Sequence, residues 1–270
     1  MRLTHRETDE IRQLVESREI RPLESLQVTE VDLYAAIELA CCQFLKRENH
    51  KILFPCVTQW AFRVPMLQSA IETIHRGNVP LRINPFRPRP WEFFPITTAS
   101  WNDNDYHLFE SRFTAAVRQA GFGRKSTALA GAFFEMADNI TQHSGPSSVN
   151  PARGILGYQV ESEQMTFGVG DVGRGVLASL TENPAWKHIE ESADALEAIV
   201  KDHASRRLGL GPGQGFLQVF KSLADMNGQL IFRSGDGLLT IAGQPDRRQA
   251  SKGSAVFFPG FQLSVSCSVK

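Results

Sequence analysis

Charge of one sign, long apolar runs and paired cysteines are all scarce in this sequence, and each absence excludes a class of function. The 270 residues contain 29 Lys plus Arg and 29 Asp plus Glu, so we expect no strongly basic nucleic-acid surface. No run approaches the roughly 20 apolar residues that a membrane-spanning helix needs. The first ten residues, MRLTHRETDE, are too polar for a signal peptide. These absences predict a soluble, cytoplasmic protein.

Cysteine is also rare. The four cysteines, Cys41, Cys42, Cys56 and Cys267, form neither a C-x-x-C pair nor a spacing that suits a metal ion. We therefore expect buried, reduced thiols. The sequence contains no internal repeat, and its 42% hydrophobic and 21% charged content is ordinary for a globular protein.

A cluster of prolines divides the chain. The segment NVPLRINPFRPRPWEFFP, residues 78–95, holds five prolines, which disfavour regular structure and predict a boundary near residue 100. The predicted domains are therefore 1–100 and 101–270. In the first we expect helices over 29–47 and 64–78 and strands over 51–57 and 79–83. This order predicts a small α/β region that distantly resembles half of a STAS-like domain, and its function stays open.

The second domain has more regular patterns. They predict helices over 105–121, 126–145, 190–205 and 216–228, and strands over 153–162, 164–171, 229–234, 238–243 and 253–266. The second of these helices contains the stretch FFEMADNITQHSG. It places Glu135, Asn139 and His143 at four-residue steps, which form one stripe of a helix. The adjacent stripe is apolar and consists of Leu129, Phe133, Met136 and Ile140. The polar stripe either faces a cavity or is a solvated surface.

A second polar stretch, VGDVGRGV, follows a predicted strand. It contains D-x-G-x-G as Asp171, Gly173 and Gly175, and glycines of this kind allow positive φ and close approach of a flat ligand. A simple glycine turn is the alternative. Gly168, Gly170 and Gly173 also spell G-x-G-x-x-G, but the dinucleotide motif needs a βαβ unit, which this pattern does not favour.

A third stretch, GLGPGQGF, precedes a predicted helix. Its alternating glycines are Gly209, Gly211, Gly213 and Gly215. Such a loop exposes backbone N–H groups beside a helix N-terminus, an arrangement that favours phosphate. The loop lacks the Lys-Ser/Thr pair of a Walker P-loop. A flexible hinge is the alternative interpretation.

The order and spacing of the three stretches are more specific than any one of them. E-x-x-D-N-x-x-x-H, then D-x-G-x-G after two strands, then G-x-G-x-G, resembles the GHKL ATPase superfamily of gyrase B, the 90-kilodalton heat-shock chaperones, histidine kinases and MutL. The resemblance covers about Asp105 to Val265. It implies an α/β fold, the two-layer Bergerat sandwich, in which helices cover one face of a mixed sheet.

The resemblance implies ATP and Mg²⁺ as ligands and a role for each matching residue. Asp171 would recognise the adenine amino group, and Gly173 and Gly175 would shape its pocket. Asn139 would help to hold Mg²⁺, and the glycines Gly209, Gly211, Gly213 and Gly215 would surround the phosphates. Glu135 matches the acid that activates water, and His143 matches a position that is often His in the small anti-sigma kinases.

The same resemblance leaves the chemistry open. Residues from about Thr181 to Arg207 would form the ATP lid, whose thin apolar stripe predicts low local stability. No phosphoacceptor histidine motif is present in the sequence. We expect no lysine from a following domain at the γ-phosphate, so hydrolysis is expected to be slow. The candidates are a slow Mg-dependent ATPase whose lid couples nucleotide state to partner binding, a serine/threonine kinase of the anti-sigma type, and a non-hydrolysing ATP-gated module. Each implies a protein partner, and a homodimer is compatible with all three.

Overall fold

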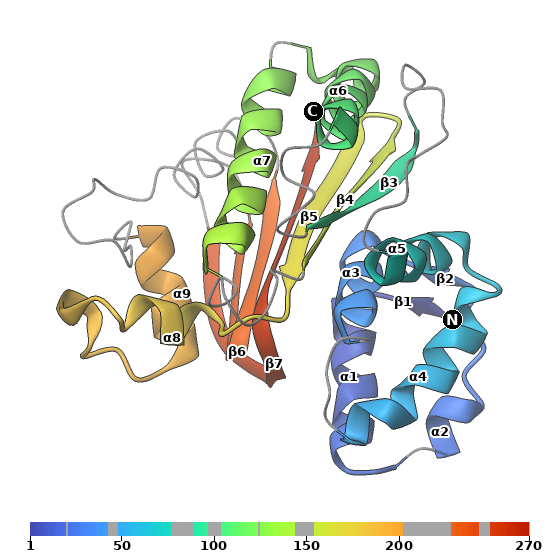
Figure 1. Ribbon diagram of the computed structural model, residues 1–270, viewed down its shortest axis with the longest axis vertical. Coiled ribbons are helices and arrows are strands. Elements are labelled where there is room, and N and C mark those ends of the chain that lie inside the picture. Colours follow the sequence, from blue (N-terminus) through green and yellow to red (C-terminus); the bar gives the residue numbers. More distant parts are fainter. Residues whose placement is uncertain are drawn as a thin grey trace.

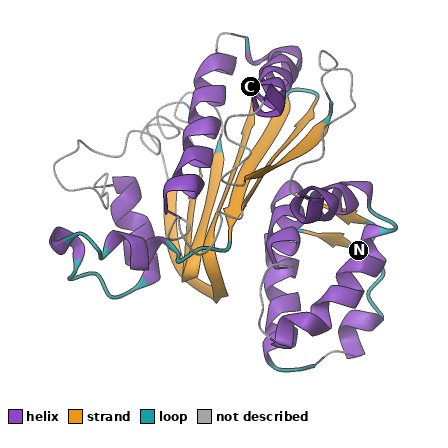
Figure 2. Cartoon of the chain, in the orientation of Figure 1, coloured by secondary structure: helices purple, strands orange, loops and turns teal. Residues whose placement is uncertain are grey.

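The chain is a mixed α/β protein built around one five-stranded sheet (Figures 1 and 2). The computed structural model describes residues 1–19, 21–42, 48–76, 89–96, 104–123, 125–143, 154–201, 228–242 and 249–269. The strand order is β3-β4-β5-β7-β6. The strands are β3 (Trp91–Ile96), β4 (Gly154–Glu161), β5 (Gln164–Asp171), β6 (Gln229–Ala242) and β7 (Gln249–Ser268). All four ladders between them are antiparallel, whereas the resemblance to the GHKL ATPases implied a mixed sheet.

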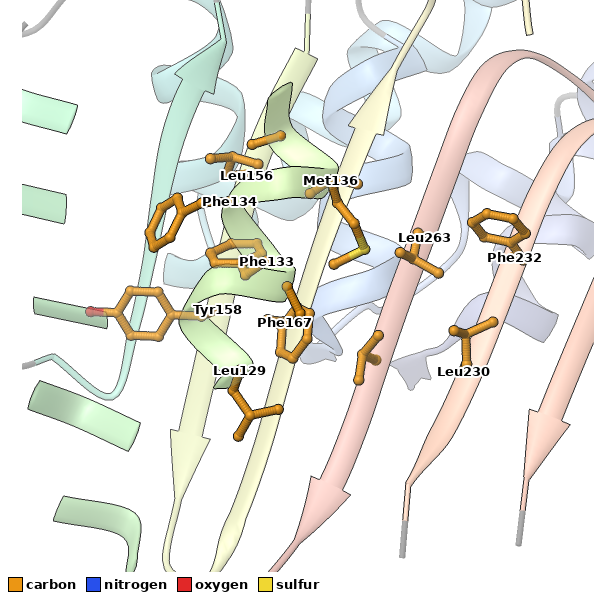
Figure 3. Packing of buried hydrophobic residues seen from close by; sticks show 14 of the residues in the cluster. Leu129, Phe133, Phe134, Met136, Leu156, Tyr158, Phe167, Leu230, Phe232 and Leu263 are labelled. Carbon is orange, nitrogen blue, oxygen red and sulfur yellow. The ribbon is translucent and has the colours of Figure 1, made fainter. Parts of the chain in front are cut away.

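One face of the sheet is covered by two helices that carry most of the aromatic core. They are α6 (Asn104–Val117) and α7 (Lys125–His143), joined by the π-helical turn η2 (Arg118–Phe122). The ring of Phe133 on α7 packs on that of Phe167 on β5, with 5.1 Å between the ring centroids (Figure 3). Its centroid is 4.8 Å from that of Phe113 on α6. Alternate residues of β5 point to this face, which is why Phe167 and its neighbours at i±2 are apolar.

The other face is covered by the N-terminal region, which packs against the sheet through α3 (Leu33–Cys42) and α5 (Pro65–Arg76). The glycines of β5 allow this close approach. A Cβ atom at Gly170 would lie 2.6 Å from Ile37, and one at Gly168 would lie 3.0 Å from it. The sheet therefore has helices on both faces, not on one as predicted, because a row without side chains admits a second helical layer.

The rest of the N-terminal region is mostly helical. It comprises β1 (Arg2–Leu3), α1 (His5–Glu16), α2 (Arg21–Glu24), β2 (Glu30–Val31) and α4 (Glu48–Ala61), and β1 and β2 form a short parallel pair. The strand predicted over 51–57 is wrong, since these residues lie inside α4. Leu53, Cys56, Val57 and Trp60 are buried at helical spacing, and Trp60 lies beyond the short run that suggested a strand.

Strand β3 lies within the segment that the prolines marked as a boundary. It pairs with β4 at the edge of the sheet, and Pro95 is tolerated there because an edge strand leaves one set of N–H groups unused. The five-stranded sheet therefore includes a strand from before residue 100. The strand predicted over 79–83 and the helix predicted over 216–228 lie outside the described residues.

A buried ionic network joins the N-terminal region to the sheet. The Glu38 carboxylate of α3 lies 3.0 Å from Arg12 of α1 and 3.1 Å from Arg233 of β6. Arg233 also lies 2.5 Å from Asp9, and both guanidinium groups stack near the ring of Phe258. The side chains of Glu38, Arg12 and Arg233 are at most 1% exposed, so the two layers share one desolvated cluster of charge. No helix in the described ranges has the length and apolar character to span a membrane.

Candidate functional site

Asp171 is the last residue of β5, and its carboxylate is buried at this end of the strand. Its side chain is on the face covered by α7, and the residue is only 4% exposed. Burial raises the pKa of this carboxyl to about 7, and the hydrogen bond from Gly173 N to Oδ1 at 2.6 Å opposes the rise. Within the described ranges, that N–H is the one donor to the Asp171 carboxylate. Its second oxygen can accept a hydrogen bond from a ligand.

The chain turns sharply after Asp171, as the D-x-G-x-G pattern predicted. Gly175 has φ +81° and immediately precedes α8 (Val176–Leu180), so this position requires a residue without a Cβ atom. The N–H of Val176 donates to Ser234 Oγ on β6 at 2.8 Å, and that hydroxyl donates to Gly260 O on β7 at 2.5 Å. The turn is thus held between Asp171 and a buried hydroxyl.

Helix α7 directs its C-terminal half toward the same end of the sheet. Figure 3 shows Met136 at the level of Leu156, and Leu129 beyond Tyr158. Gly154 of β4 pairs with Asp171, and along β4 Leu156 is closer than Tyr158 to Gly154. Helix α7 therefore runs in the same direction as β5. The segment of α7 that follows Met136 therefore extends toward the end of the sheet where Asp171 lies.

The apolar stripe predicted for α7 is confirmed where it is described. Leu129, Phe133 and Met136 are buried against the sheet, and Glu135 is partly buried. The helical backbone continues to His143, but the side chains of residues 138–143, including Asn139, Ile140 and His143, lie outside the described residues. The structure thus describes the helix that carries the polar stripe, but not the side chains of Asn139 and His143.

The phosphate loop predicted from Gly209, Gly211, Gly213 and Gly215 lies outside the described residues. Among the residues that are described, no group of three or more His, Cys, Asp or Glu side chains could hold a metal ion. The side chain of Asn139, the Mg²⁺ ligand predicted from the sequence, also lies outside the described residues.

The dinucleotide alternative for Gly168, Gly170 and Gly173 is not supported by the fold. Strand β5 pairs with antiparallel neighbours and is not part of a βαβ unit among the described strands. Gly168 and Gly170 instead contact α3 through the backbone, as described above. Their role is to admit a helix to the second face of the sheet.

The first part of the predicted lid is packed more firmly than its sequence suggested. It contains the short turn η3 (Pro184–Trp186) and α9 (Ser192–Lys201), which lies beside β6 (Figure 1). A Cβ atom at Gly237 of β6 would lie 2.6 Å from the backbone N of Ala193. The buried residues of α9 are Ala195, Leu196, Ala198 and Val200. The prediction of few buried contacts is therefore wrong for α9, because Ala195 and Ala198 are buried in the core together with Leu196 and Val200.

A separate pocket of about 290 Å³ opens where the N-terminal region meets the sheet. Its floor includes the paired hydroxyls of Thr166 and Ser266, 3.0 Å apart, and its wall includes Arg2, His5 and Asp32. Burial raises the pKa of Asp32 to about 6. Acidic and basic groups both line this pocket, so its charge favours no single class of ligand.

Two residues near Asp171, Ser234 and Gly260, carry no motif that marks them in the sequence. Gly260 has φ +106°, and a Cβ atom there would lie 2.2 Å from Asp171 O. A glycine inside a predicted strand is a weak signal for a bulge or a close approach. Nothing local distinguishes Ser234 from other strand serines, since its partners come from distant segments.

Comparison with known proteins adds no constraint. Neither a scan against protein-family models nor a search of curated proteins finds a match for this chain.

Proposed function

We propose that this chain binds ATP and Mg²⁺ at the Asp171 end of the sheet, in the manner of the GHKL ATPases that its motifs resemble. The observation that carries the proposal is Asp171, a carboxylate 4% exposed at a strand end within a glycine turn. Burying such a group costs free energy unless it is paired. Carboxylates in this condition are concentrated at functional sites, which supports a ligand-binding role.

The chemistry of Asp171 favours adenine over guanine. Its free oxygen is an acceptor, so it would bind the exocyclic amine of adenine in a charge-assisted hydrogen bond. Guanine presents a carbonyl oxygen at the corresponding position and would be repelled. The positive φ of Gly175 keeps side chains out of the turn, which suits the approach of a flat base to the backbone.

The phosphate end of the nucleotide would lie toward the C-terminal half of α7. Asn139 would hold Mg²⁺ together with phosphate oxygens, and bound Mg²⁺ would neutralise charge on the phosphates. Glu135 is one turn earlier and would orient and deprotonate an attacking water. His143 would lie near the nucleotide, and Gly209, Gly211, Gly213 and Gly215 would donate backbone N–H groups to phosphate.

The activity we propose is slow Mg-dependent hydrolysis of ATP, with the nucleotide state governing the binding of a protein partner. Transfer to a serine or threonine of the partner, as in the anti-sigma kinases, uses the same base and is the alternative. A module that binds ATP without hydrolysis is the third candidate. ADP release over many turnovers by the purified chain separates hydrolysis from the other two.

Calorimetry and thermal shift with ATP, GTP and adenosine test the nucleotide site. The parent protein should bind ATP more tightly than GTP, and Mg²⁺ should strengthen ATP binding but not adenosine binding. Asp171→Asn should weaken adenosine binding about 10- to 100-fold, the effect of losing a charge-assisted bond. Asp236→Asn on the exposed edge of β6 is the matched control and should bind like the parent. Equal stabilisation by ATP and GTP in the parent would refute the assignment of adenine to Asp171.

A further inference from the structure

Ser234 occupies a special place relative to Asp171 in the sheet. Both residues pair with Phe261 of β7, Asp171 from β5 and Ser234 from β6. Directly opposed residues of neighbouring strands point to the same face. Asp171 and Ser234 therefore face the same layer, on either side of a buried phenylalanine.

The hydroxyl of Ser234 makes two hydrogen bonds to backbone groups of different segments. It accepts from Val176 N at 2.8 Å and donates to Gly260 O at 2.5 Å, and Ser234 is 1% exposed. Helix α8 begins at Val176, and its N-cap residue, Gly175, has no side chain with which to cap the helix. Ser234 supplies this cap from a distant strand.

Strand β7 is irregular at the same place. The ladder between β6 and β7 shifts register between Ser234 and Gly235, which leaves Gly260 in a bulge with φ +106°. The bulge brings Gly260 against the backbone of Asp171, where a Cβ atom would lie 2.2 Å from the Asp171 oxygen. Bulges of this kind redirect side chains beside functional sites.

These contacts act on the turn from both of its ends. The Asp171 carboxylate holds Gly173 N at 2.6 Å, while Ser234 holds the N–H of Val176. Removing the Ser234 hydroxyl would leave a buried N–H and a buried carbonyl without this partner, so the turn would shift to satisfy them. A shift there moves the peptide groups around the Asp171 carboxylate.

We propose that Ser234 is a positioning residue that fixes the geometry of the adenine-binding turn and so sets the preference for ATP over GTP. This inference rests on the proposed nucleotide site. Ser234 would not contact the nucleotide itself, and its effect would pass through Val176, Gly260 and the turn between Asp171 and Gly175. A residue with a merely structural role would weaken both nucleotides alike.

The test is the ratio of GTP to ATP dissociation constants in Ser234→Ala. We expect ATP affinity to fall about tenfold, the effect of losing the Asp171–adenine hydrogen bond, with little change for GTP, so the ratio falls by a similar factor. Tyr158→Phe is the matched control, since it also removes one buried hydroxyl, which bonds Glu92 of β3 at 3.1 Å, at the opposite edge of the sheet from β6. It should keep the parent ratio. Ser234→Cys, which retains a weak donor, should give an intermediate ratio.

The outcomes separate this inference from the function on which it rests. If the parent shows no preference for ATP, the proposed function fails. If the parent prefers ATP and Ser234→Ala keeps the same ratio, the positioning role is refuted while the nucleotide site stands. If Ser234→Ala does not fold, Ser234→Cys decides the question, and a parental ratio in that variant overturns the proposal.

Discussion

Replacing Asp171 by asparagine should make this protein more stable while it weakens nucleotide binding. The carboxyl is buried, and its pKa is raised from 3.8 to about 7 by that burial. At 1.36 kcal/mol per pKa unit, this difference between the unfolded and folded pKa values lowers the free energy of unfolding at high pH by at most about 4 kcal/mol. Asparagine must also be desolvated, which offsets part of this gain, so we expect about 2 kcal/mol of added stability at pH 8. It still accepts the bond from Gly173 N.

The dependence on pH gives the sharper signature. Between pH 3.8 and about 7 the folded state of the parent binds more protons at this site than the unfolded chain. The parent therefore loses stability as the pH rises through this window, and the variant does not lose this contribution. The advantage of Asp171→Asn should grow from pH 5 to pH 7 and stay level above that.

Urea unfolding at pH 5, 6, 7 and 8 measures the effect, with the midpoint and slope fitted at each pH. Asp236→Asn, at an exposed position, should change the free energy of unfolding by less than about 0.5 kcal/mol. If Asp171→Asn is less stable than the parent at pH 8, or if its advantage is the same at every pH, a buried carboxylate with a raised pKa is the wrong description of this site.

Three further predictions concern the buried ionic network, the proposed base Glu135 and the packing of α9. Glu38→Gln should cost about 3–5 kcal/mol in urea unfolding, because the buried Arg12 loses its carboxylate and the buried Arg233 keeps only Asp9, whereas Glu10→Gln, at an exposed pair with Arg6, should cost under about 0.5 kcal/mol. Similar costs for both would contradict the buried network. Glu135→Gln should retain ATP affinity within a few-fold while ADP release falls by about a hundredfold or more, and release at the parent rate would exclude it as the base. Amide exchange over residues 192–201 should be slow without nucleotide because α9 is packed against β6, and fast exchange there would count against this docking.

The spacing of apolar residues along the chain explains which parts of the fold could be predicted from the sequence. The apolar stripe of α7, the pair β4 and β5, and the helix α5 were all predicted with nearly the observed bounds. Their signals are periodic and local, since each buried face is set by residues three or four apart in a helix or two apart in a strand. The short run 51–57 was misassigned as a strand because its burial pattern becomes helical only when Trp60 is included.

The same distinction between local and long-range signals applies to the candidate site. The sequence by itself determined that Asp171 ends a strand and enters a glycine turn, because the alternation of β5 and the glycine spacing are both local. Only the tertiary structure decided that Asp171 is buried, that α3 covers the second face of the sheet, and that Ser234 and Gly260 hold the turn. The Ser234–Val176 bond joins residues 58 positions apart, and no local preference encodes such a pairing. It forms because packing of the whole sheet brings the turn after β5 against the interiors of β6 and β7, where buried polar groups must find partners.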